Sequence, residues 1–200
     1  MNIKANLEKL LDLYEYLKAE EKIKEAPVFE LYSIKSKDKW LTVWGTILSS
    51  RTRDKSLIKV MKDIETRFRD PFDVVAVSLE ELEKLLKPLG FYKSKAKIFW
   101  KFNKEIIDRY KMEIPKKIEE LIKLPGVGLK VGSIILNDLY GYDFIGVDVH
   151  VFRILKRVGF VVIKNPEYLW KILHSDEVKK VISKEVYKNL NRYVVAFGQT

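Results

Sequence analysis

The sequence predicts an all-α protein, because apolar residues recur at intervals of three and four along most of its 200 residues, which is the spacing of one helix face. Two segments are instead rich in β-branched residues, FIGVDVHVF at 144–152 and FVVIK at 160–164. A strand without a partner is unstable in water, so we interpret residues 144–152 as a loop that enters a helix. The stripes and caps together predict about ten helices.

Apolar stripes predict the helices of the N-terminal part. Three of these stripes are Leu7, Leu10, Leu11, Tyr14 and Leu17; Trp40, Val43, Trp44, Ile47 and Leu48; and Leu57, Ile58, Met61, Ile64 and Phe68. A fourth helix is predicted after Ser78, which has the spacing of a capping box with Glu81 ahead of Leu82. Gly90 is placed to end that helix.

The rest of the chain contains four more helical patterns. Ser94 is suited to cap a helix that runs to Tyr110, and Pro115 is suited to open a short one. Asp148 precedes a further stripe, and a long pattern follows Asp176. The apolar residues of these patterns are Ile98, Phe99, Phe102 and Ile106; Ile118, Leu121 and Ile122; Val149, Phe152, Leu155 and Val158; and Val178, Val181, Ile182, Val186, Leu190, Val194 and Phe197.

Basic residues outnumber acidic ones. The chain has 38 Lys and Arg against 28 Asp and Glu, a formal net charge of +10. This balance favours a polyanionic partner such as nucleic acid. A second explanation stays open, because a surface rich in Lys and Glu in a chain without cysteine is also typical of proteins from thermophiles.

The chain contains no cysteine, which excludes disulfides, a thiolate nucleophile, and cysteine-bound zinc or iron–sulfur clusters within it. Its two histidines are too few for a histidine metal site, so we expect no metal and interpret His150 as support for the helix start at Asp148. The N-terminal segment alternates charged and apolar residues, unlike a signal peptide or a membrane span. We therefore expect a cytoplasmic protein whose catalysis uses oxygen and nitrogen groups.

The segment LPGVGLK at 124–130 predicts a tight hairpin between two helices. Pro125 ends the first helix, the glycines permit positive φ and close backbone approach, and a new helix begins at about Leu129. Free backbone amides at such a junction bind a phosphate oxygen, and the residues that would present them are Leu124, Gly126, Val127 and Gly128. An ordinary helix–helix connection with a glycine cap is the alternative.

Lys130 stands in the first turn of the new helix, where the helix dipole disfavours a cation by a few tenths to about 1 kcal/mol. The same dipole, with partial burial, favours the neutral amine, which is a nucleophile that forms Schiff bases with sugar aldehydes. Asp148 follows eighteen residues later between Val147 and Val149. Its carboxylate is suited to cap a helix, to act beside Lys130, or to do both.

These segments together resemble the endonuclease III family of helix-hairpin-helix DNA glycosylases. The similar segments are LPGVGLKVGSIILN, GVDVHVFRILKRVGF, ILSSRTRDKSL and LGFYKSKAKIF, in the family's order from about Trp40 to Phe160. The resemblance implies two helical domains that flank a DNA-binding cleft. One is a six-helix barrel domain with the helix-hairpin-helix at 32–142, and the other is formed by both termini, 1–31 and 143–200. It also implies a monomer that acts on double-stranded DNA.

The resemblance implies a bifunctional enzyme with Lys130 and Asp148 as catalytic residues. A damaged base is flipped out of the duplex, Lys130 attacks C1′, Asp148 stabilises the developing positive charge, and the resulting Schiff base allows strand cleavage by β-elimination. The implied substrate is an oxidised pyrimidine of the thymine-glycol type, or an abasic site. Two alternatives stay open: a monofunctional mismatch or uracil glycosylase, and a non-catalytic helix-hairpin-helix DNA-binding module.

The chain departs from the family in two places. Family members commonly hold a [4Fe-4S] cluster on four cysteines after a segment resembling RYVVAFGQT, so we expect either a missing segment or a branch without the cluster, and no cofactor in this chain. Arg51 stands where many relatives have a glutamine that enters the gap left by the flipped base. We expect Arg51 and Phe91 to fill that gap, the alternative being a surface phosphate contact and a core residue, respectively.

Overall fold

The computed structural model describes residues 3–160 and 165–200, and across these ranges it contains thirteen α-helices, one 3-10 helix and no strand. The elements are α1 (Ile3–Ala19), η1 (Glu21–Glu25), α2 (Pro27–Lys35), α3 (Lys39–Leu48), α4 (Asp54–Arg67), α5 (Pro71–Ala76), α6 (Leu79–Leu86), α7 (Tyr92–Tyr110), α8 (Ile118–Leu121), α9 (Leu129–Tyr140), α10 (Val149–Arg157), α11 (Pro166–Leu173), α12 (Asp176–Lys179) and α13 (Lys184–Phe197). The predicted all-α fold is confirmed. Residues 144–148 form the predicted loop into α10, while 161–164 of the second β-branched segment lie outside the described residues.

Several predicted helix boundaries need correction. The capping box of Ser78 and Glu81 is present at the start of α6, but this helix ends at Leu86 rather than at Gly90. Pro88 explains the earlier end, because a proline has no N–H to continue the helical hydrogen bonds, although Lys87 before it still has helical geometry. The long pattern after Asp176 is also two helices, since the Ser183 side chain accepts a hydrogen bond from the Val186 amide and begins α13 as a separate element.

Two other predicted caps are wrong. Ser94 lies inside the first turn of α7, which begins at Tyr92 after Phe91 in a left-handed conformation. Pro115 precedes α8 without opening it, because that helix begins at Ile118 after Lys117. The predicted count of about ten helices is low, because the short helices α2, α5 and α11 were not predicted.

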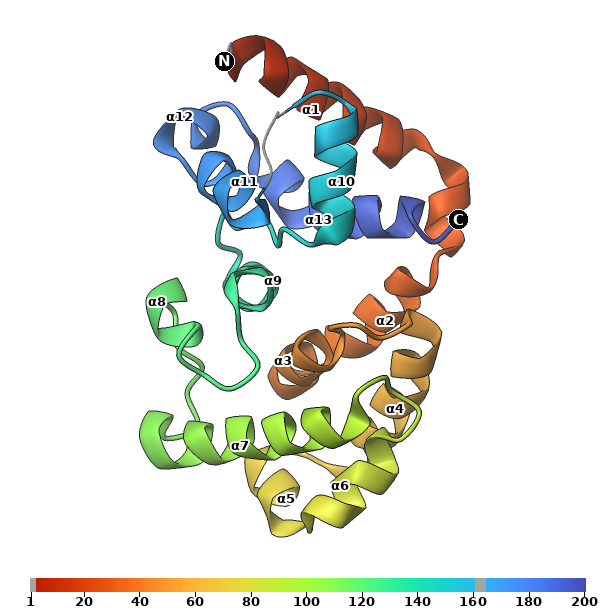
Figure 1. The fold of residues 1–200 in the computed structure, drawn as a ribbon, viewed down its shortest axis with the longest axis vertical. Helices are drawn as coiled ribbons and strands as arrows, with labels where there is room; N and C mark the ends of the chain where they lie inside the picture. Colours follow the sequence, from red (N-terminus) through yellow and green to blue (C-terminus); the bar gives the residue numbers. More distant parts are fainter. Residues whose placement is uncertain (1–2, 161–164) are drawn as a thin grey trace.

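Buried side chains form two separate hydrophobic cores. The first is built from residues of α2 to α9, and the second from α1, η1 and the helices after residue 144. Figure 1 shows the corresponding halves of the molecule, with α3 to α7 in the lower half and α1 and α10 to α13 in the upper half. Their separation supports the predicted division into 32–142 and 1–31 with 143–200, which remains our proposal.

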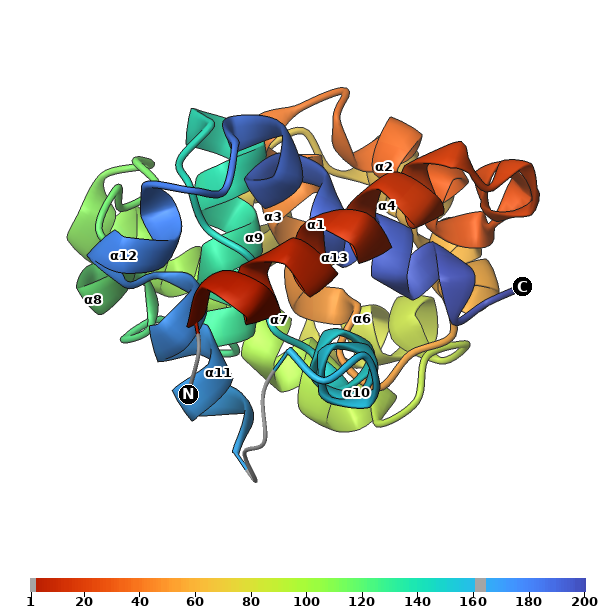
Figure 2. The same cartoon turned by 90° about the horizontal axis from the view of Figure 1, so that it is seen from above.

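The second core joins the two ends of the chain. Helix α1 lies across α13 in the view from above (Figure 2). The fully buried ring of Tyr14 carries a hydroxyl that donates to the Glu185 carboxylate at 3.2 Å, and Lys18 forms an ion pair with the same carboxylate at 2.8 Å. Near the C-terminus, the Gln199 side chain accepts from the Val28 amide at 3.2 Å. Residues 171 positions apart therefore stabilise one helical unit.

Two polar side chains connect the cores. The buried Asn137 of α9 donates to the carbonyl of Phe144 at 2.8 Å and to that of Tyr187 at 3.0 Å. His174 accepts from the Ile145 amide at 2.9 Å through Nε2, which leaves Nδ1 to donate to the Trp170 carbonyl at 2.6 Å. This arrangement requires a neutral imidazole. Burial accordingly lowers the pKa of His174 from 6.5 to about 4, with the Trp170 carbonyl opposing the shift and Lys179 adding to it.

The stability of the protein should therefore fall in acid through His174. Its folded pKa lies below its unfolded value, so the unfolded state binds more protons as pH falls from 6.5 towards 4, and the free energy of unfolding decreases. Between pH 7 and pH 5 this loss is on the order of 2 kcal/mol. Chemical denaturation of the wild type and His174→Gln at both pH values measures it. A variant that loses as much stability as the wild type over this interval would contradict the assignment.

Candidate active site

The hairpin forms where the sequence predicts it. Gly126 has a φ of 78°, and a Cβ atom there would lie 2.4 Å from Ile98 Cγ2, so only glycine fits. Gly128 has a φ of −100° and precedes α9, which begins at Leu129 as predicted. Gly126 therefore uses the positive φ that a glycine permits, whereas Gly128 does not and instead leaves open space around the helix start.

Only two of the four predicted hairpin amides keep their donors for a ligand. The amides of Leu124 and Val127 donate to the carbonyls of Leu121 and Leu124 at 3.0 and 3.1 Å, whereas those of Gly126 and Gly128 have no acceptor among the described residues. Gly126 and Gly128 are exposed, whereas the side chains of Leu124 and Val127 belong to the first core. Gly128 offers no side chain to cap α9, so the first-turn N–H groups keep their capacity to bind an anion at the positive end of the helix dipole.

Lys130 and Asp148 come together because the chain doubles back along α9. Twelve residues of helix advance about 18 Å, and the extended segment that follows, 141–148, is long enough to return over that distance. Gly141 reverses the chain with a φ of 65°. Gly146 then passes so close to α9 that a Cβ atom would lie 2.5 Å from Ile134 Cγ1 and 3.2 Å from the Lys130 carbonyl.

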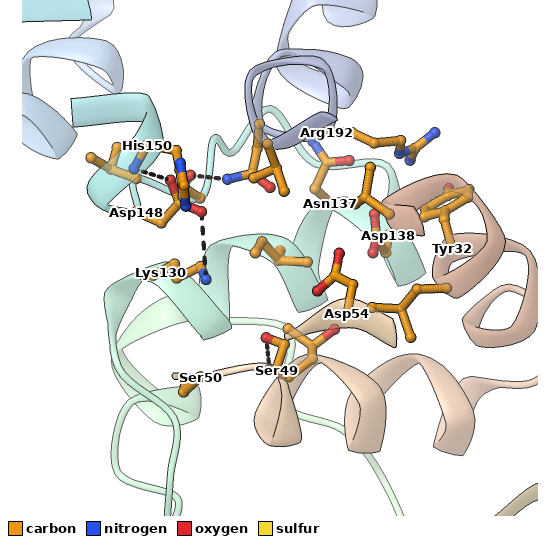
Figure 3. Close-up of a pocket in the computed structure, with 18 of the residues that line it drawn as sticks. Tyr32, Ser49, Ser50, Asp54, Lys130, Asn137, Asp138, Asp148, His150 and Arg192 are labelled. Atoms are coloured by element: carbon orange, nitrogen blue, oxygen red, sulfur yellow. Dashed lines mark hydrogen bonds and ion pairs between the residues drawn. The ribbon is translucent and has the colours of Figure 1, made fainter. Parts of the chain in front are cut away.

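The two oxygens of Asp148 have different partners (Figure 3). Oδ1 accepts hydrogen bonds from the amides of His150 and Val151, both at 2.9 Å, and so caps α10. Oδ2 lies 3.6 Å from Lys130 Nζ. The side chain of Asp148 is 10% exposed and that of Lys130 is 31% exposed, so the amine remains reachable while its carboxylate partner is enclosed.

This pair lies in a cavity of about 670 Å³ between the two cores. Arg51 and His150 also line the cavity, so it gathers four of the predicted site residues, while Phe91 and the hairpin lie outside its lining. The amide of His150, in the first turn of α10, donates to Asp148. The His150 ring packs against Gly198, where a Cβ atom would lie 2.8 Å from Nδ1 of the ring.

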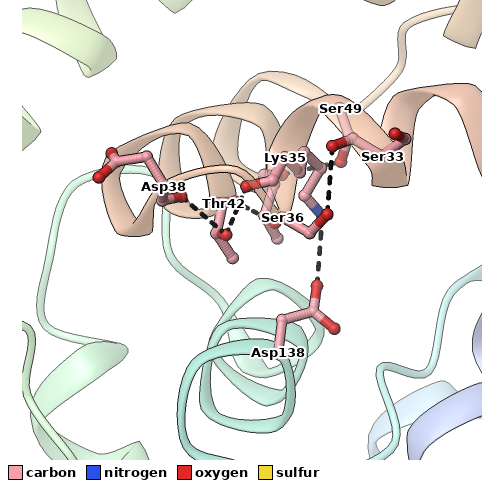
Figure 4. Close-up of polar contacts among 8 residues, drawn as sticks. Ser33, Lys35, Ser36, Asp38, Thr42, Ser49 and Asp138 are labelled. Atoms are coloured by element: carbon pink, nitrogen blue, oxygen red, sulfur yellow. Dashed lines mark hydrogen bonds and ion pairs between the residues drawn. The ribbon is translucent and has the colours of Figure 1, made fainter. Parts of the chain in front are cut away.

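The cavity contains a second lysine–aspartate pair. Lys35 Nζ at the end of α2 lies 3.5 Å from Asp138 Oδ2 on α9 (Figure 4), and each side chain is 11% exposed. Burial lowers the pKa of Lys35, and Asp138 partly opposes this shift. The backbone of Lys35 is also held in place, because the Thr42 hydroxyl donates to the Lys35 carbonyl at 2.7 Å.

Arg51 and Phe91 lie side by side at the tips of two exposed loops. Both have left-handed backbone conformations, with φ of 52° and 59°, and the Arg51 guanidinium carbon lies 5.6 Å from the centre of the Phe91 ring. Phe91 is 65% exposed, which excludes a core role for it. A Cβ atom on Gly90 would lie 3.1 Å from the Arg51 carbonyl, so the loops are in contact.

Lys95 makes hydrogen bonds to the loops of both Arg51 and Phe91. Its side chain is 7% exposed and donates from Nζ to the hydroxyl of Thr52, while its amide donates to the Phe91 carbonyl at 3.0 Å. Burial lowers the pKa of Lys95 to about 8. The amine therefore connects the Arg51 loop to the start of α7.

The described residues offer no ligand set for an iron–sulfur cluster. The chain has no cysteine, and residues 3–160 and 165–200 contain no group of three or more metal-ligating side chains arranged to hold an ion. Within the same ranges, no helix is long and apolar enough to cross a bilayer.

Several polar residues of the cavity were not predicted from the sequence. They are Tyr32, Lys35, Asp54, Asn137, Asp138, Asn191 and Arg192. Asp138 and Asn137 carry a local signal, because they are polar residues within the otherwise apolar helix of Lys130. The others reach the cavity from α2, α4 and α13 through tertiary packing, which no local pattern specifies.

The hairpin between α8 and α9 makes this a helix-hairpin-helix protein. Comparison with known proteins identifies its family. The chain belongs to the HhH-GPD superfamily of base excision DNA repair proteins, whose sequence model matches residues 44–175. The resemblance to endonuclease III is confirmed by curated relatives. Endonuclease III of Thermotoga maritima is 32% identical over 165 residues, which make up 82% of this chain and 75% of that protein.

Two further comparisons extend this result. Endonuclease III of Bacillus subtilis is 39% identical over 117 residues, 58% of this chain, and the chain spans only 53% of that relative. The solved structure of a trapped endonuclease III–DNA covalent intermediate matches with a TM-score of 0.72 and 30% identity, covering 85% of this chain and 82% of that one.

Proposed function

We propose that this protein is a base excision repair DNA glycosylase with abasic-site lyase activity. The observation that carries the proposal is the Lys130 amine 3.6 Å from the enclosed Asp148 carboxylate, in a cavity between two helical cores. An amine nucleophile beside a proton-accepting carboxylate is the arrangement that Schiff-base chemistry on a sugar requires. The trapped covalent complex of the similar endonuclease III with DNA supports the same chemistry.

The reaction begins with a base flipped into the cavity, because C1′ is inaccessible inside the stack. Lys130 gives up a proton to Asp148 and its amine attacks C1′, and the glycosidic bond breaks with its electron pair leaving on the base, which takes up that proton from Asp148. The Asp148 carboxylate stabilises the positive charge that develops on the sugar and accepts the amine proton. Opening of the sugar ring gives a Schiff base, loss of a C2′ proton breaks the C3′–O bond, and the 3′ phosphate leaves.

The hairpin and the two loops would hold the DNA around this site. Amides at Gly126 and Gly128 suit backbone phosphate, which positions a duplex without specifying sequence. Arg51 and Phe91 would enter the space left by the flipped nucleotide, Arg51 by bonding the orphaned base and Phe91 by stacking. A duplex partner accounts for the net charge of +10, and we propose that the protein acts on it as a monomer at the nucleoid in the cytoplasm.

Two other functions are weaker explanations. A non-catalytic helix-hairpin-helix module has no use for an accessible lysine paired with an enclosed aspartate. A monofunctional mismatch or uracil glycosylase leaves Lys130 without a role. We propose oxidised pyrimidines of the thymine-glycol type as the substrates, with the chemistry of this chain's own residues requiring no metal or cluster.

Borohydride reduction should trap the wild type on abasic-site DNA through Lys130. Lys130→Arg keeps the charge beside Asp148 but removes the nucleophilic amine, so trapping should fall at least about 100-fold. Lys35→Arg is the matched control, since Lys35 lines the same cavity and also faces an aspartate. Gel quantification of the covalent complex measures both. Loss of trapping in the Lys35 variant alone would move the nucleophile to α2.

Asp148 should affect excision more than stability. In Asp148→Asn the amide oxygen can still cap α10, but the charge that faces Lys130 is lost. Single-turnover base excision should therefore fall by about two or more orders of magnitude, while the free energy of unfolding changes by less than about 1 kcal/mol. Normal excision with reduced stability would identify Asp148 as a helix cap alone.

The two hairpin glycines should respond differently to alanine. Gly126→Ala should lower the free energy of unfolding by about 2 to 4 kcal/mol, because it combines a left-handed backbone with a clash against Ile98. Gly128→Ala meets open space and should leave the fold intact but weaken binding to lesion-bearing and undamaged duplexes alike. Thermal unfolding and fluorescence anisotropy separate the two effects. A loss of affinity confined to lesion-bearing DNA would assign Gly128 to base recognition.

A further inference from the structure

Two lysines are buried in the part of the chain that the structure describes, and they differ in their partners. Lys35 is 8% exposed and Lys95 is 7% exposed. Lys35 faces the Asp138 carboxylate, whereas the amine of Lys95 forms no ion pair with a described residue and donates to the Thr52 hydroxyl. Burial accordingly lowers the pKa of Lys95 from 10.5 to about 8, with no carboxylate to oppose the shift.

A buried amine of this kind is unfavourable for stability. An ammonium group taken out of water loses its hydration, and a single hydroxyl acceptor replaces only part of it. A carboxylate partner would offset the loss, and a methionine would fill similar space without incurring it. The packing of α7 alone therefore gives no reason for a lysine at position 95, so the role of the amine lies in what it connects.

The amine of Lys95 connects two segments that lie 43 residues apart. Thr52 follows Arg51 in the loop after α3, and its hydroxyl also bonds the Leu48 carbonyl at 3.1 Å, where α3 ends. The amide of Lys95 donates to the Phe91 carbonyl at 3.0 Å, where α7 begins. One residue therefore joins the loop of Arg51 to the loop of Phe91.

The contact between Arg51 and Phe91 at the loop tips is too weak to hold both side chains by itself. The guanidinium carbon lies 5.6 Å from the centre of a ring that is 65% exposed, and a cation–π contact at an exposed site contributes little. Both residues also have a left-handed backbone, and together these two conformations cost more than that contact returns. The hydrogen bonds of Lys95 supply further attachment for both loops.

We propose that Lys95 is a positioning residue that holds Arg51 and Phe91 together as one preassembled wedge, which enters the gap in the duplex as a unit. This inference rests on the flipped nucleotide of the proposed function and adds the residue that makes the two loops act together. Ordering a flexible side chain on binding reduces affinity, so a wedge that is ordered in the free protein loses less on insertion. The amine is retained for DNA binding at the expense of stability.

Two independent side chains are the alternative to a single wedge. Independent residues have effects on affinity that multiply when both are replaced. Residues that act as a unit have effects that do not multiply, because removing either one already disables the pair. The two cases are therefore distinguished by DNA affinity alone, without base excision.

The test measures the affinity for two duplexes by fluorescence anisotropy. One duplex is undamaged, and the other contains a tetrahydrofuran site, which leaves a gap in the stack but cannot form a Schiff base. The wild type should prefer the tetrahydrofuran duplex. Arg51→Ala and Phe91→Ala should each reduce this preference about tenfold, the scale of a lost stacking contact, and the double variant should reduce it by no more than about threefold further.

Replacement of Lys95 should remove this coupling. Lys95→Met should itself reduce the preference by about three- to tenfold. In the Lys95→Met background, Arg51→Ala and Phe91→Ala should each have a smaller effect, and the two effects should multiply. Lys101→Met removes an exposed charge from the same helix and should leave the coupling unchanged.

Stability separates this role from a purely structural one. Urea denaturation of Lys95→Met should give a midpoint at or above that of the wild type, because the buried charge without a carboxylate partner is gone. Thr52→Val removes the acceptor but leaves the amine, so it should lower the midpoint and weaken the preference for the tetrahydrofuran duplex. Thr52→Ser retains the hydroxyl and should restore both.

Four results would overturn the inference. They are a wild type without preference for the tetrahydrofuran duplex, multiplying effects of Arg51→Ala and Phe91→Ala in the wild-type background, an unchanged preference in Lys95→Met, and a urea midpoint of Lys95→Met below that of the wild type. None of these measurements involves the amine of Lys130. Borohydride trapping on abasic-site DNA therefore decides the proposed chemistry separately, and a failure there is distinguishable from a failure of the wedge.

Discussion

The carboxylate of Asp148 is the contact on which the geometry of the site depends. Because Oδ1 is held by two amides of α10, the direction of this helix determines where Oδ2 points, and Oδ2 faces Lys130 at 3.6 Å. A lysine in the first turn of α9 opposes the helix dipole, and this carboxylate offsets that cost. The close passage of Gly146 along α9 makes the approach possible.

Two lysine–aspartate pairs in one cavity differ in accessibility rather than in chemistry. Lys35 and Asp138 are both enclosed, and removing one member of a buried pair costs about 3 to 5 kcal/mol because it leaves an unpaired charge. The Lys130 side chain is more exposed than that of Lys35, at 31% against 11%. Lys130 can therefore move from Asp148 towards a substrate, whereas the ion pair of Lys35 and Asp138 holds α2 against α9.

The sequence predicts the helices and the pair of reacting groups, but not the residues opposite them. Lys130 and Asp148 are recognisable because each stands at a helix start, where capping and dipole effects are local. Tyr32 and Arg192 have no such signal, since the contact of the Arg192 guanidinium with the Tyr32 ring depends on how α2 packs against α13. The break between α12 and α13 was missed for a similar reason: a polar turn at Ser183 interrupts an apolar periodicity that continues across it.

Backbone strain at Arg51 and Phe91 argues that these loops serve a purpose other than stability. A left-handed conformation costs a residue with a side chain about 1 kcal/mol or more, and glycine would avoid that cost at both positions. Lys111 and Met112 are also left-handed, but they end α7, where such a conformation satisfies helix carbonyls. Arg51 and Phe91 end no helix in this way. They are held in contact by Gly90 and by the buried amine of Lys95, so the structure maintains two strained, exposed side chains together beside the cavity.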